Sequence, residues 1–283
     1  ASAKLGDNEA CQLQQYAARL ISRGVPVIFS LGHLAKITGL DYGFLHDTVS
    51  RKREAANYRM FSITKRSGGR RFIHAVSGKL LAMQQFLNAA MLQKIQPHSA
   101  SFAFHSSGGI AKCATRHCGA KWLLQFDLAD FFFSITEPRV YQVFKRIGYR
   151  ELLAFELARL CTTTRLPKYV KLKNRRCINF GNLKILPDDS GCSRAPYAPQ
   201  WSMGVLPQGA PTSPMLSNLV ALQLDECLDK YAQEQGFVYT RYADDLTFSS
   251  SRLPAGKPVE RVRSHILGLI RRNGFVENRK KIR

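Results

Sequence analysis

The sequence predicts a mixed α/β protein with an antiparallel sheet backed by helices, and three observations support this. An alternating run over 237–242 leads into two adjacent acids and then into Leu246–Phe248, which indicates two strands joined by a tight turn. The apolar run Trp122–Phe126 indicates another strand. From Leu216 to Leu228, apolar residues recur at helical spacing. With 283 residues and 45% hydrophobic content, the chain can bury a substantial core in one or two domains.

Three carboxylates are expected at the ends of these strands. Asp244 and Asp245 form the tip of the predicted hairpin, and Asp127 ends the strand that begins at Trp122. Adjacent carboxylates repel each other, so we expect divalent cations, which prefer hard oxygen ligands, to compensate them. Two metal ions on such acids clamp the attacking and leaving oxygens of an in-line phosphoryl transfer. The alternatives are a helix-capping role for Asp127 and a simple exposed turn, as we expect for Asp188-Asp189.

A loop rich in Pro and Gly precedes the helix predicted after Ser213. Ser213 suits the N-cap and Pro214 suits the first helical position, where its missing N–H costs nothing. We expect the helix to continue to about Gly236. A loop that feeds a helix N-terminus and presents the carboxamide of Gln208 is suited to holding a nucleotide. Taken alone, the same segment is also consistent with an ordinary loop-to-helix connection.

Together the three segments resemble the reverse transcriptase family, and specifically its retron-type bacterial branch. The motifs are FDLADFF at 126–132, LPQGAPTSP at 206–214 and YADD at 242–245. The similarity covers nearly the whole chain through further segments, which are Leu20–Val27, Leu31–Ala35, Tyr58–Ile73, Leu80–Leu87, the stretch from Ser101 to His117, and Gly274–Lys281. One departure is Cys113, because retron enzymes usually have Asn at the start of an Asn-Ala-x-x-His pattern that here keeps Ala114 and His117.

The resemblance implies a right-hand polymerase with fingers and palm, and it assigns roles to individual residues. Asp127, Asp244 and Asp245 would be catalytic and would bind two Mg²⁺ ions, with Mn²⁺ as a substitute. Phe132 would lie beneath the sugar and exclude a 2′-hydroxyl; core packing is the alternative for the phenylalanines on either side. The full set implied to bind the nucleotide is Lys65, Arg71, Leu128, Asp130, Phe131, Phe132, Gln208, Gly209 and Lys281. Arg66 and Arg70 compete in sequence for the fingers roles and are expected to contact nucleic acid.

The expected domains follow one another along the chain. Residues 1–55 form an N-terminal helical extension, residues 56–120 form fingers, and residues 121–283 form the palm. Helices are predicted over Glu9–Arg23, His33–Arg51, Pro138–Ile147, Glu151–Thr163 and Pro258–Asn273. The resemblance further implies a C-terminal thumb, which is absent or truncated here, so we expect the native protein to be longer.

Residues 165–205 form a basic insertion within the palm. Its cations include Lys171, Lys173, Arg175 and Arg176, and cationic loops with interspersed aromatics suit nucleic acid. We expect this insertion to contact the structured RNA or a partner protein, and a solvated surface loop is the alternative.

Composition agrees with a nucleic-acid partner. The formal charge of +22, from 42 Lys and Arg against 20 Asp and Glu, is the electrostatic footprint of a phosphate-backbone binder. An anionic lipid surface is the alternative, but no apolar run approaches the roughly 20 residues of a membrane helix. We therefore expect a cytoplasmic protein without a membrane partner. Cys113, His117 and Cys118 raise a zinc alternative, which the absence of a Cys-x-x-Cys pair disfavours.

The resemblance implies an RNA-directed DNA polymerase of a retron. A structured non-coding RNA would supply template and primer, deoxynucleotides would be the substrates, and the product would be branched RNA-linked DNA (msDNA), an RNA–DNA hybrid. The system would act in antiphage defence with an effector protein. The alternatives are another bacterial reverse transcriptase lineage, of the intron or abortive-infection type, and an RNA-binding scaffold that restrains a toxic effector.

Overall fold

The computed structural model describes residues 7–65, 68–170, 197, 203–252 and 259–278. Several residues that the sequence singled out lie outside this part of the chain, namely Arg66, Lys171, Lys173, Arg175, Arg176 and Lys281. The chain forms two compact units, Ala1–Ile95 with Thr136–Thr212 and Gln96–Ile135 with Ser213–Arg283. The expected division into extension, fingers and palm remains a prediction, and the two units are described separately below.

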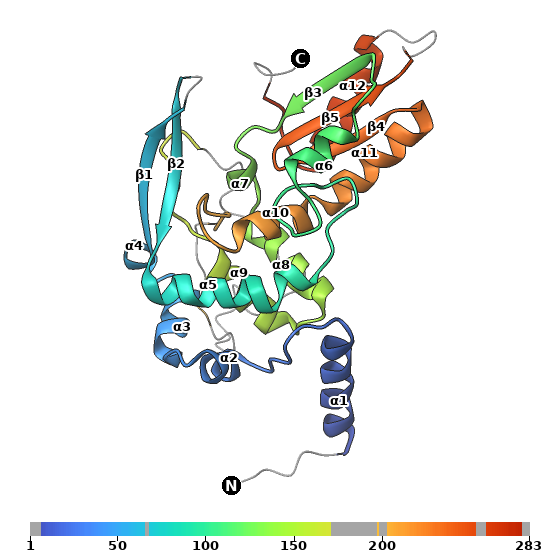
Figure 1. The fold of residues 1–283 in the computed structure, drawn as a ribbon. Coiled ribbons are helices and arrows are strands. Elements are labelled where there is room, and N and C mark those ends of the chain that lie inside the picture. The colour runs from blue at the N-terminus through green and yellow to red at the C-terminus, as the bar shows by residue number, and fades with distance from the viewer. Residues whose placement is uncertain (1–6, 66–67, 171–196, 198–202, 253–258, 279–283) are drawn as a thin grey trace, which may run out of the picture. The chain divides into compact units, whose positions relative to one another are not determined.

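The first unit contains a β-hairpin and several helices (Figure 1). The hairpin consists of β1 (Tyr58–Thr64) and β2 (Arg70–Val76), which pair antiparallel. The helices are α1 (Asp7–Ser22), α2 (Leu31–Thr38), α3 (Tyr42–Val49), α4 (Glu54–Asn57), α5 (Gly78–Ala90), α8 (Glu137–Ile147) and α9 (Glu151–Cys161), with a 3₁₀ turn η1 at Leu92–Lys94.

The predicted helix over His33–Arg51 is divided in two, which corrects the sequence-based expectation. Gly39 adopts the left-handed conformation with φ 67° and ends α2. Asp41 then begins α3, because its carboxylate accepts a hydrogen bond from the Phe44 amide at 2.7 Å. A left-handed Gly and an Asp N-cap are ordinary helix stop and start signals, so the division was readable in the sequence.

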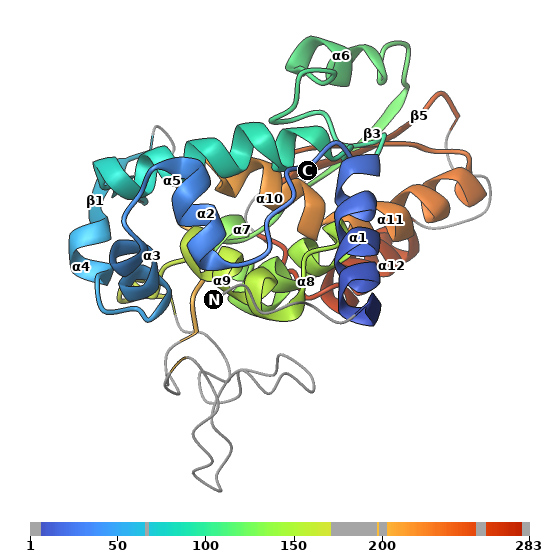
Figure 2. The same cartoon turned by 90° about the horizontal axis from the view of Figure 1, so that it is seen from below.

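Helix α9 lies at the centre of the first unit. It packs against α3, α5 and α8, and α8 and α9 lie side by side in the views of Figures 1 and 2. Every residue of α9 from Leu153 to Cys161 is buried. A helix that is buried all round must also bury its polar residues, and α9 carries both Glu156 and Arg159 into the core.

The buried Glu156 gives a prediction about pH. Its carboxylate accepts a hydrogen bond from Tyr197 Oη at 2.6 Å, and burial raises its pKa to about 7. In the unfolded chain this carboxyl group has its ordinary pKa of about 4.5. Between about pH 4.5 and 7 the unfolded state releases the proton while the folded state keeps it, so the free energy of unfolding falls as pH rises through this range. Glu156→Gln should remove this loss and raise the free energy of unfolding at pH 8 by up to about 3 kcal/mol.

Urea unfolding of both proteins at pH 5 and pH 8 measures this effect. Glu151→Gln, in the same helix with a side chain that is 58% exposed, is the matched control and should keep the wild-type pH dependence. If Glu156→Gln had the same pH dependence as the wild type, Glu156 would not be the titrating group.

The second unit contains a three-stranded antiparallel sheet in the order β3-β5-β4. The strands are β3 (Trp122–Asp127), β4 (Val238–Tyr242) and β5 (Asp245–Ser250). The helices are α6 (Ile110–Thr115), α7 (Phe131–Ser134), α10 (Ser213–Val220), α11 (Leu222–Gln235) and α12 (Val259–Arg272). The predicted fold class, mixed α/β with an antiparallel sheet and helices, is confirmed at this level.

Alternation along the strands gives the sheet one buried and one more open face. Phe126, Leu246 and Phe248 are buried on the first face. Arg241 on the same face forms an ion pair with Asp225 of α11, and α12 packs on α11 behind the sheet (Figure 1). Since successive side chains point to opposite faces, the carboxylate of Asp245 belongs to the other face.

The helix predicted from Ser213 to about Gly236 is interrupted at Ala221, which is a second correction. Ala221 has ψ −1°, far from the α-helical value near −42°, and separates α10 from α11. Apolar spacing continues across this residue, so periodicity could not locate the break. The end at Gly236 is confirmed, because that glycine adopts a left-handed conformation after Gln235.

Within the described part of the chain, no helix combines the length and the apolar character that crossing a bilayer requires.

Candidate active site

The three predicted carboxylates lie at neighbouring strand ends in the second unit. Asp127 is the last residue of β3, Asp245 is the first of β5, and the two are direct partners in the antiparallel register. Asp244 precedes Asp245 in the turn from β4, and its carbonyl accepts a hydrogen bond from the Leu128 amide at 2.9 Å. The structure therefore brings the three acidic positions together, as the sequence predicted.

The turn between β4 and β5 holds an unusual backbone conformation. Ala243 has φ 57°, a left-handed value that costs a non-glycine residue roughly 1–2 kcal/mol. Arg241 Nη1 donates to the carbonyl oxygen of Ala243 at 3.1 Å and helps to hold the turn. Strained backbone of this kind clusters at functional sites, where the surrounding structure maintains it.

Asn278 is a contact of the site that sequence reasoning missed. Its side-chain Nδ2 donates to Asp127 Oδ1 at 2.9 Å, and its amide donates to the Asp127 carbonyl at 2.7 Å. Asn278 belongs to the motif at Gly274–Lys281, but no spacing pattern connects it with a residue 151 positions earlier. These two bonds fix the orientation of a carboxylate that is only 5% exposed. Asp127 therefore ends a strand and does not cap α7, which begins at Phe131.

The donor chemistry of the site suits Mg²⁺. Like charges directly opposite each other on a sheet are destabilising, and the register pair of Asp127 with Asp245 is such a case. Among the described residues, no group of three or more His, Cys, Asp or Glu side chains is arranged to hold a metal ion. Mg²⁺ is usually bound by one or two carboxylates together with waters and substrate phosphates, and the register pair supplies two carboxylates.

A cavity of about 660 Å³ lies on the open face of the sheet, beside the carboxylates. Asp127 and Asp245 line it, together with Gln125 of β3 and Thr247 of β5. These form two register pairs that are neighbours on this face of the sheet, Asp127 with Asp245 and Gln125 with Thr247. The volume lies within the roughly 300–1,000 Å³ that ligand sites usually occupy.

Helix α6 and the residues after it bound the other side of this cavity through His117. The ring places Nδ1 2.6 Å from Ser249 Oγ and Nε2 2.7 Å from Thr240 Oγ1, and Cys113 Sγ donates to the same Thr240 oxygen at 3.3 Å. Burial, and secondarily Arg116, lowers the pKa of His117 below its ordinary value. Cys113 and His117, which raised the zinc alternative, thus both contact the sheet.

The aromatic residues after Asp127 divide between core and surface. Phe131 and Phe133 are each 4% exposed, whereas Phe132 is half-buried between the rings of Phe131 and Phe104, at centroid distances of 5.6 and 6.3 Å. Leu128 is also buried at 2%, so a nucleotide contact from Leu128 or Phe131 would have to come from the backbone. Asp130 is exposed and left-handed, with φ 46°.

The predicted triphosphate-binding cations lie in the first unit. Lys65, Arg70 and Arg71 are all exposed at the turn end of the β1–β2 hairpin. Because Arg70 and Arg71 are consecutive in β2, their side chains point to opposite faces of the hairpin. Only one of these two arginines can contact a ligand bound on a given face of the hairpin. The segments packed on each face therefore indicate which arginine lies on the side of the Gln208 loop.

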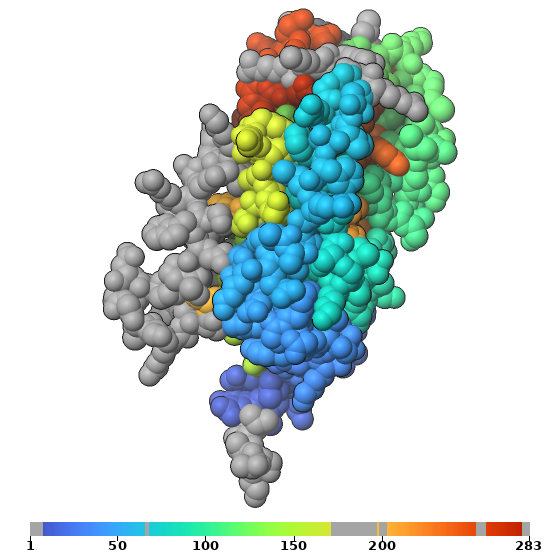
Figure 3. All heavy atoms as spheres, turned by 90° about the vertical axis from the view of Figure 1, so that its left-hand side faces the viewer, coloured from blue at the N-terminus to red at the C-terminus, as the bar shows by residue number. Residues whose placement is uncertain are grey.

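One face of β2 is covered by residues 165–170, which run along the hairpin in Figure 3. Tyr169 contacts the ring of Phe72 at a centroid distance of 5.5 Å, and His74 Nε2 donates to the Arg165 carbonyl at 2.8 Å. Arg70, Phe72 and His74 are alternate residues of β2, so their side chains lie on the same face. Arg70 therefore belongs to the face that residues 165–170 cover.

Gly209 packs against the other face of β2. A Cβ on Gly209 would lie 3.0 Å from Ile73 Cγ2 and 2.9 Å from the His74 carbonyl oxygen, and its φ is 111°. The preceding residue, Gln208, accepts the His74 amide through its carbonyl at 2.7 Å. Arg71 and Ile73 are alternate residues of β2, so their side chains lie on the same face. Arg71 therefore lies on the face that the loop of Gln208 and Gly209 contacts. The register thus favours Arg71 over Arg70.

Comparison with known proteins identifies the class to which this fold and these acids belong. The family model described as reverse transcriptase (RNA-dependent DNA polymerase) matches residues 51–283. The chain therefore belongs to the reverse transcriptase family.

Individual relatives place it in the retron branch of that family. The chain is 34% identical over 268 residues to the retron Mx65 reverse transcriptase of Myxococcus xanthus, a match that covers 94% of this chain and 57% of that protein. It is 31% identical over 265 residues to the retron Ec86 reverse transcriptase of Escherichia coli, covering 93% and 69% respectively. The resemblance seen in the sequence is confirmed, and the chain spans 57% and 69% of the length of these two relatives.

Proposed function

We propose that this chain carries the fingers and palm of a right-hand polymerase that extends DNA on an RNA template. The observation that supports this most strongly is the register pair of Asp127 and Asp245, with Asp244 in the adjoining turn. These carboxylates would hold two Mg²⁺ ions, which supply charge stabilisation for an in-line attack on a nucleotide α-phosphate. Asn278 would keep the Asp127 carboxylate in a fixed orientation through its hydrogen bond.

Nucleotide-binding roles are proposed within each unit by itself. In the first unit, Arg71 and Lys65 would bind the triphosphate, and Gln208 would contact the nucleotide while Gly209 lets the backbone approach. Because guanidinium groups bind phosphate in a bidentate manner, Arg71 should contribute more than Lys65. In the second unit, Phe132 would lie beneath the sugar.

Replacing Phe132 should relax the choice of sugar. Phe132→Ala removes the bulk that would meet a 2′-hydroxyl, so discrimination against ribonucleotides, measured as the ratio of kcat/KM values, should fall by about tenfold or more. Phe133→Leu is the control, since Phe133 is 4% exposed and packs in the core. Equal discrimination in the Phe132→Ala variant and the wild type would remove this role.

The retron relatives support a more specific substrate. A structured non-coding RNA would serve as template and primer, the product would be msDNA, and an effector protein would act with the enzyme in defence. The formal charge of +22 supports an RNA partner. The presence of all three carboxylates supports catalysis over a purely scaffolding role.

Primer extension by the full-length protein tests the polymerase. An RNA template with an annealed primer is incubated with deoxynucleotides and Mg²⁺, and extension is followed on a denaturing gel. We expect RNA-templated synthesis that stops when the metal is chelated. A protein that binds the RNA tightly but extends nothing on it would contradict the proposal.

A further inference from the structure

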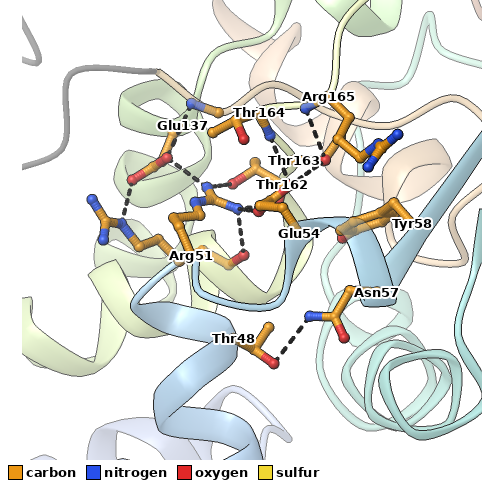
Figure 4. Close-up of polar contacts among 12 residues, drawn as sticks. Thr48, Arg51, Glu54, Asn57, Tyr58, Glu137, Thr162, Thr163, Thr164 and Arg165 are labelled. Carbon is orange, nitrogen blue, oxygen red and sulfur yellow. Dashed lines mark hydrogen bonds and ion pairs between the residues drawn. The ribbon is translucent and has the colours of Figure 1, made fainter.

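A buried cluster of charged residues in the first unit joins four separate elements (Figure 4). This Arg51 cluster consists of Arg51 after α3, Glu54 of α4, Glu137 of α8 and Arg159 of α9. Glu137 accepts from Arg51 Nη2 at 2.6 Å and from Arg159 Nε at 2.9 Å. Arg51 Nη1 donates to Glu54 Oε1 at 2.8 Å. Two arginines therefore face two carboxylates.

Three of the four charged side chains of the cluster are deeply buried, and that of Glu54 is 16% exposed. The side chains of Arg51, Glu137 and Arg159 are at most 3% exposed. Burial opposes the ionisation of Glu137, but Arg51 and Arg159 outweigh it and hold the pKa of this carboxyl below its ordinary value. Replacing a buried ion cluster with apolar residues is often neutral or stabilising. The main consequence of such a cluster is therefore the geometry that it fixes.

The cluster fixes the backbone at Gly204. The Gly204 amide donates to Glu137 Oε2 at 3.2 Å, and the Glu137 amide donates to the Gly204 carbonyl at 2.8 Å. A Cβ at this position would lie 2.3 Å from Arg51 Nη2 and 2.7 Å from Glu137 Oε2. Only glycine allows the main chain to pass this close to the buried charges.

The next residue extends this attachment to a second segment. Val205 and Thr163 exchange two backbone hydrogen bonds of 2.9 Å. Thr163 Oγ1 donates to Glu54 Oε2 at 2.6 Å, and Arg51 Nη2 donates to Thr162 Oγ1 at 2.6 Å. The cluster therefore holds both the chain that leaves α9 and the chain that returns at Gly204.

The returning chain leads directly to Gln208, whose carbonyl accepts the His74 amide of β2. We propose that the Arg51 cluster is a positioning device for the loop 204–209, which sets where Gln208 is presented to the nucleotide. This inference rests on the proposed function, since it takes Gln208 as a nucleotide contact. Arg51 and Glu137 are positioning residues here, because they act through the loop and touch no substrate.

Gly204→Ala in the full-length protein tests the proposal. The added methyl group must displace the loop or the cluster, so Gln208 would be presented to the nucleotide from a shifted position. We expect the KM for deoxynucleotide to rise about tenfold or more, while kcat changes by less than about threefold and the Kd for the RNA is unchanged. Gly78→Ala is the matched control, because a Cβ on Gly78 meets no atom within 4 Å.

Amide hydrogen exchange gives a second readout that does not depend on activity. In Gly204→Ala, exchange at residues 203–209 should become about tenfold faster, whereas exchange in β3, β4 and β5 should not change. If that variant fails to fold, Thr163→Val replaces it: this change removes the hydroxyl group that donates to Glu54 and accepts from the Arg165 amide, and both effects should be about threefold.

The outcomes separate this inference from the proposed function. If a folded variant keeps wild-type exchange at 203–209 or the wild-type KM, the positioning role is wrong. If the unaltered protein incorporates no deoxynucleotide, the proposed function fails, and the exchange measurement still decides whether the cluster holds the loop.

Discussion

Asp245→Asn is expected to abolish DNA synthesis while RNA binding stays intact. The change removes one negative charge from the register pair with Asp127 and keeps the shape of the side chain. Losing Asp245 as the proposed metal ligand should remove several kcal/mol of transition-state stabilisation, which corresponds to a fall in kcat of about a thousandfold or more. Asp245 is exposed, so the folded state should tolerate the change. Single-nucleotide incorporation and RNA binding measure the two effects.

A matched control for this prediction is Glu226→Gln, which neutralises an exposed acid of α11 in the same unit. It should keep wild-type synthesis. An Asp245→Asn protein with full activity would show that the carboxylates at the strand ends are not the catalytic centre.

Asp225→Ala is expected to cause the largest loss of stability in the second unit. Asp225 and Arg241 are both fully buried and are joined by two hydrogen bonds of 2.7 and 2.6 Å. Removing the carboxylate leaves a buried guanidinium without its counter-charge, which typically costs about 3–5 kcal/mol. It also removes the acceptor for Tyr239 Oη. Urea unfolding gives the free-energy change.

The same variant should impair catalysis in whatever fraction remains folded, because Arg241 also holds the Ala243 carbonyl in the turn before the acids. Asp225→Asn keeps one acceptor and the side-chain volume, so its loss of stability should be smaller. A loss below about 1 kcal/mol for Asp225→Ala would show that the ion pair does not hold this unit together.

Local patterns predicted the strands and the acids at their ends. The alternation before Asp244 and the apolar run before Asp127 predicted that both strands end at carboxylates, and the register confirmed that Asp127 and Asp245 are partners. Such features depend on neighbouring residues, for which alternation and turn chemistry are reliable signals. The split of the helix at Gly39 was also written in local signals.

Contacts between distant residues could not be predicted in this way. The Asn278 bond to Asp127, the His117 bonds to Thr240 and Ser249, and the Arg51 bond to Glu137 all join residues more than 80 positions apart. No periodicity relates such positions. The proposal of Arg71 rather than Arg70 as a triphosphate contact likewise required knowing which face of β2 the loop of Gly209 covers.

The nucleic acid that co-purifies with the full-length protein from its own host tests the central claim most directly. Wild-type protein and the Asp245→Asn variant are purified and digested with protease. Portions treated with DNase, RNase or debranching enzyme are then run on a denaturing gel. We predict a discrete species that shifts with all three treatments in the wild type, and RNA alone in the variant. Finding no DNA with the wild type, or the same DNA with the variant, would contradict the assignment of retron DNA synthesis to these carboxylates.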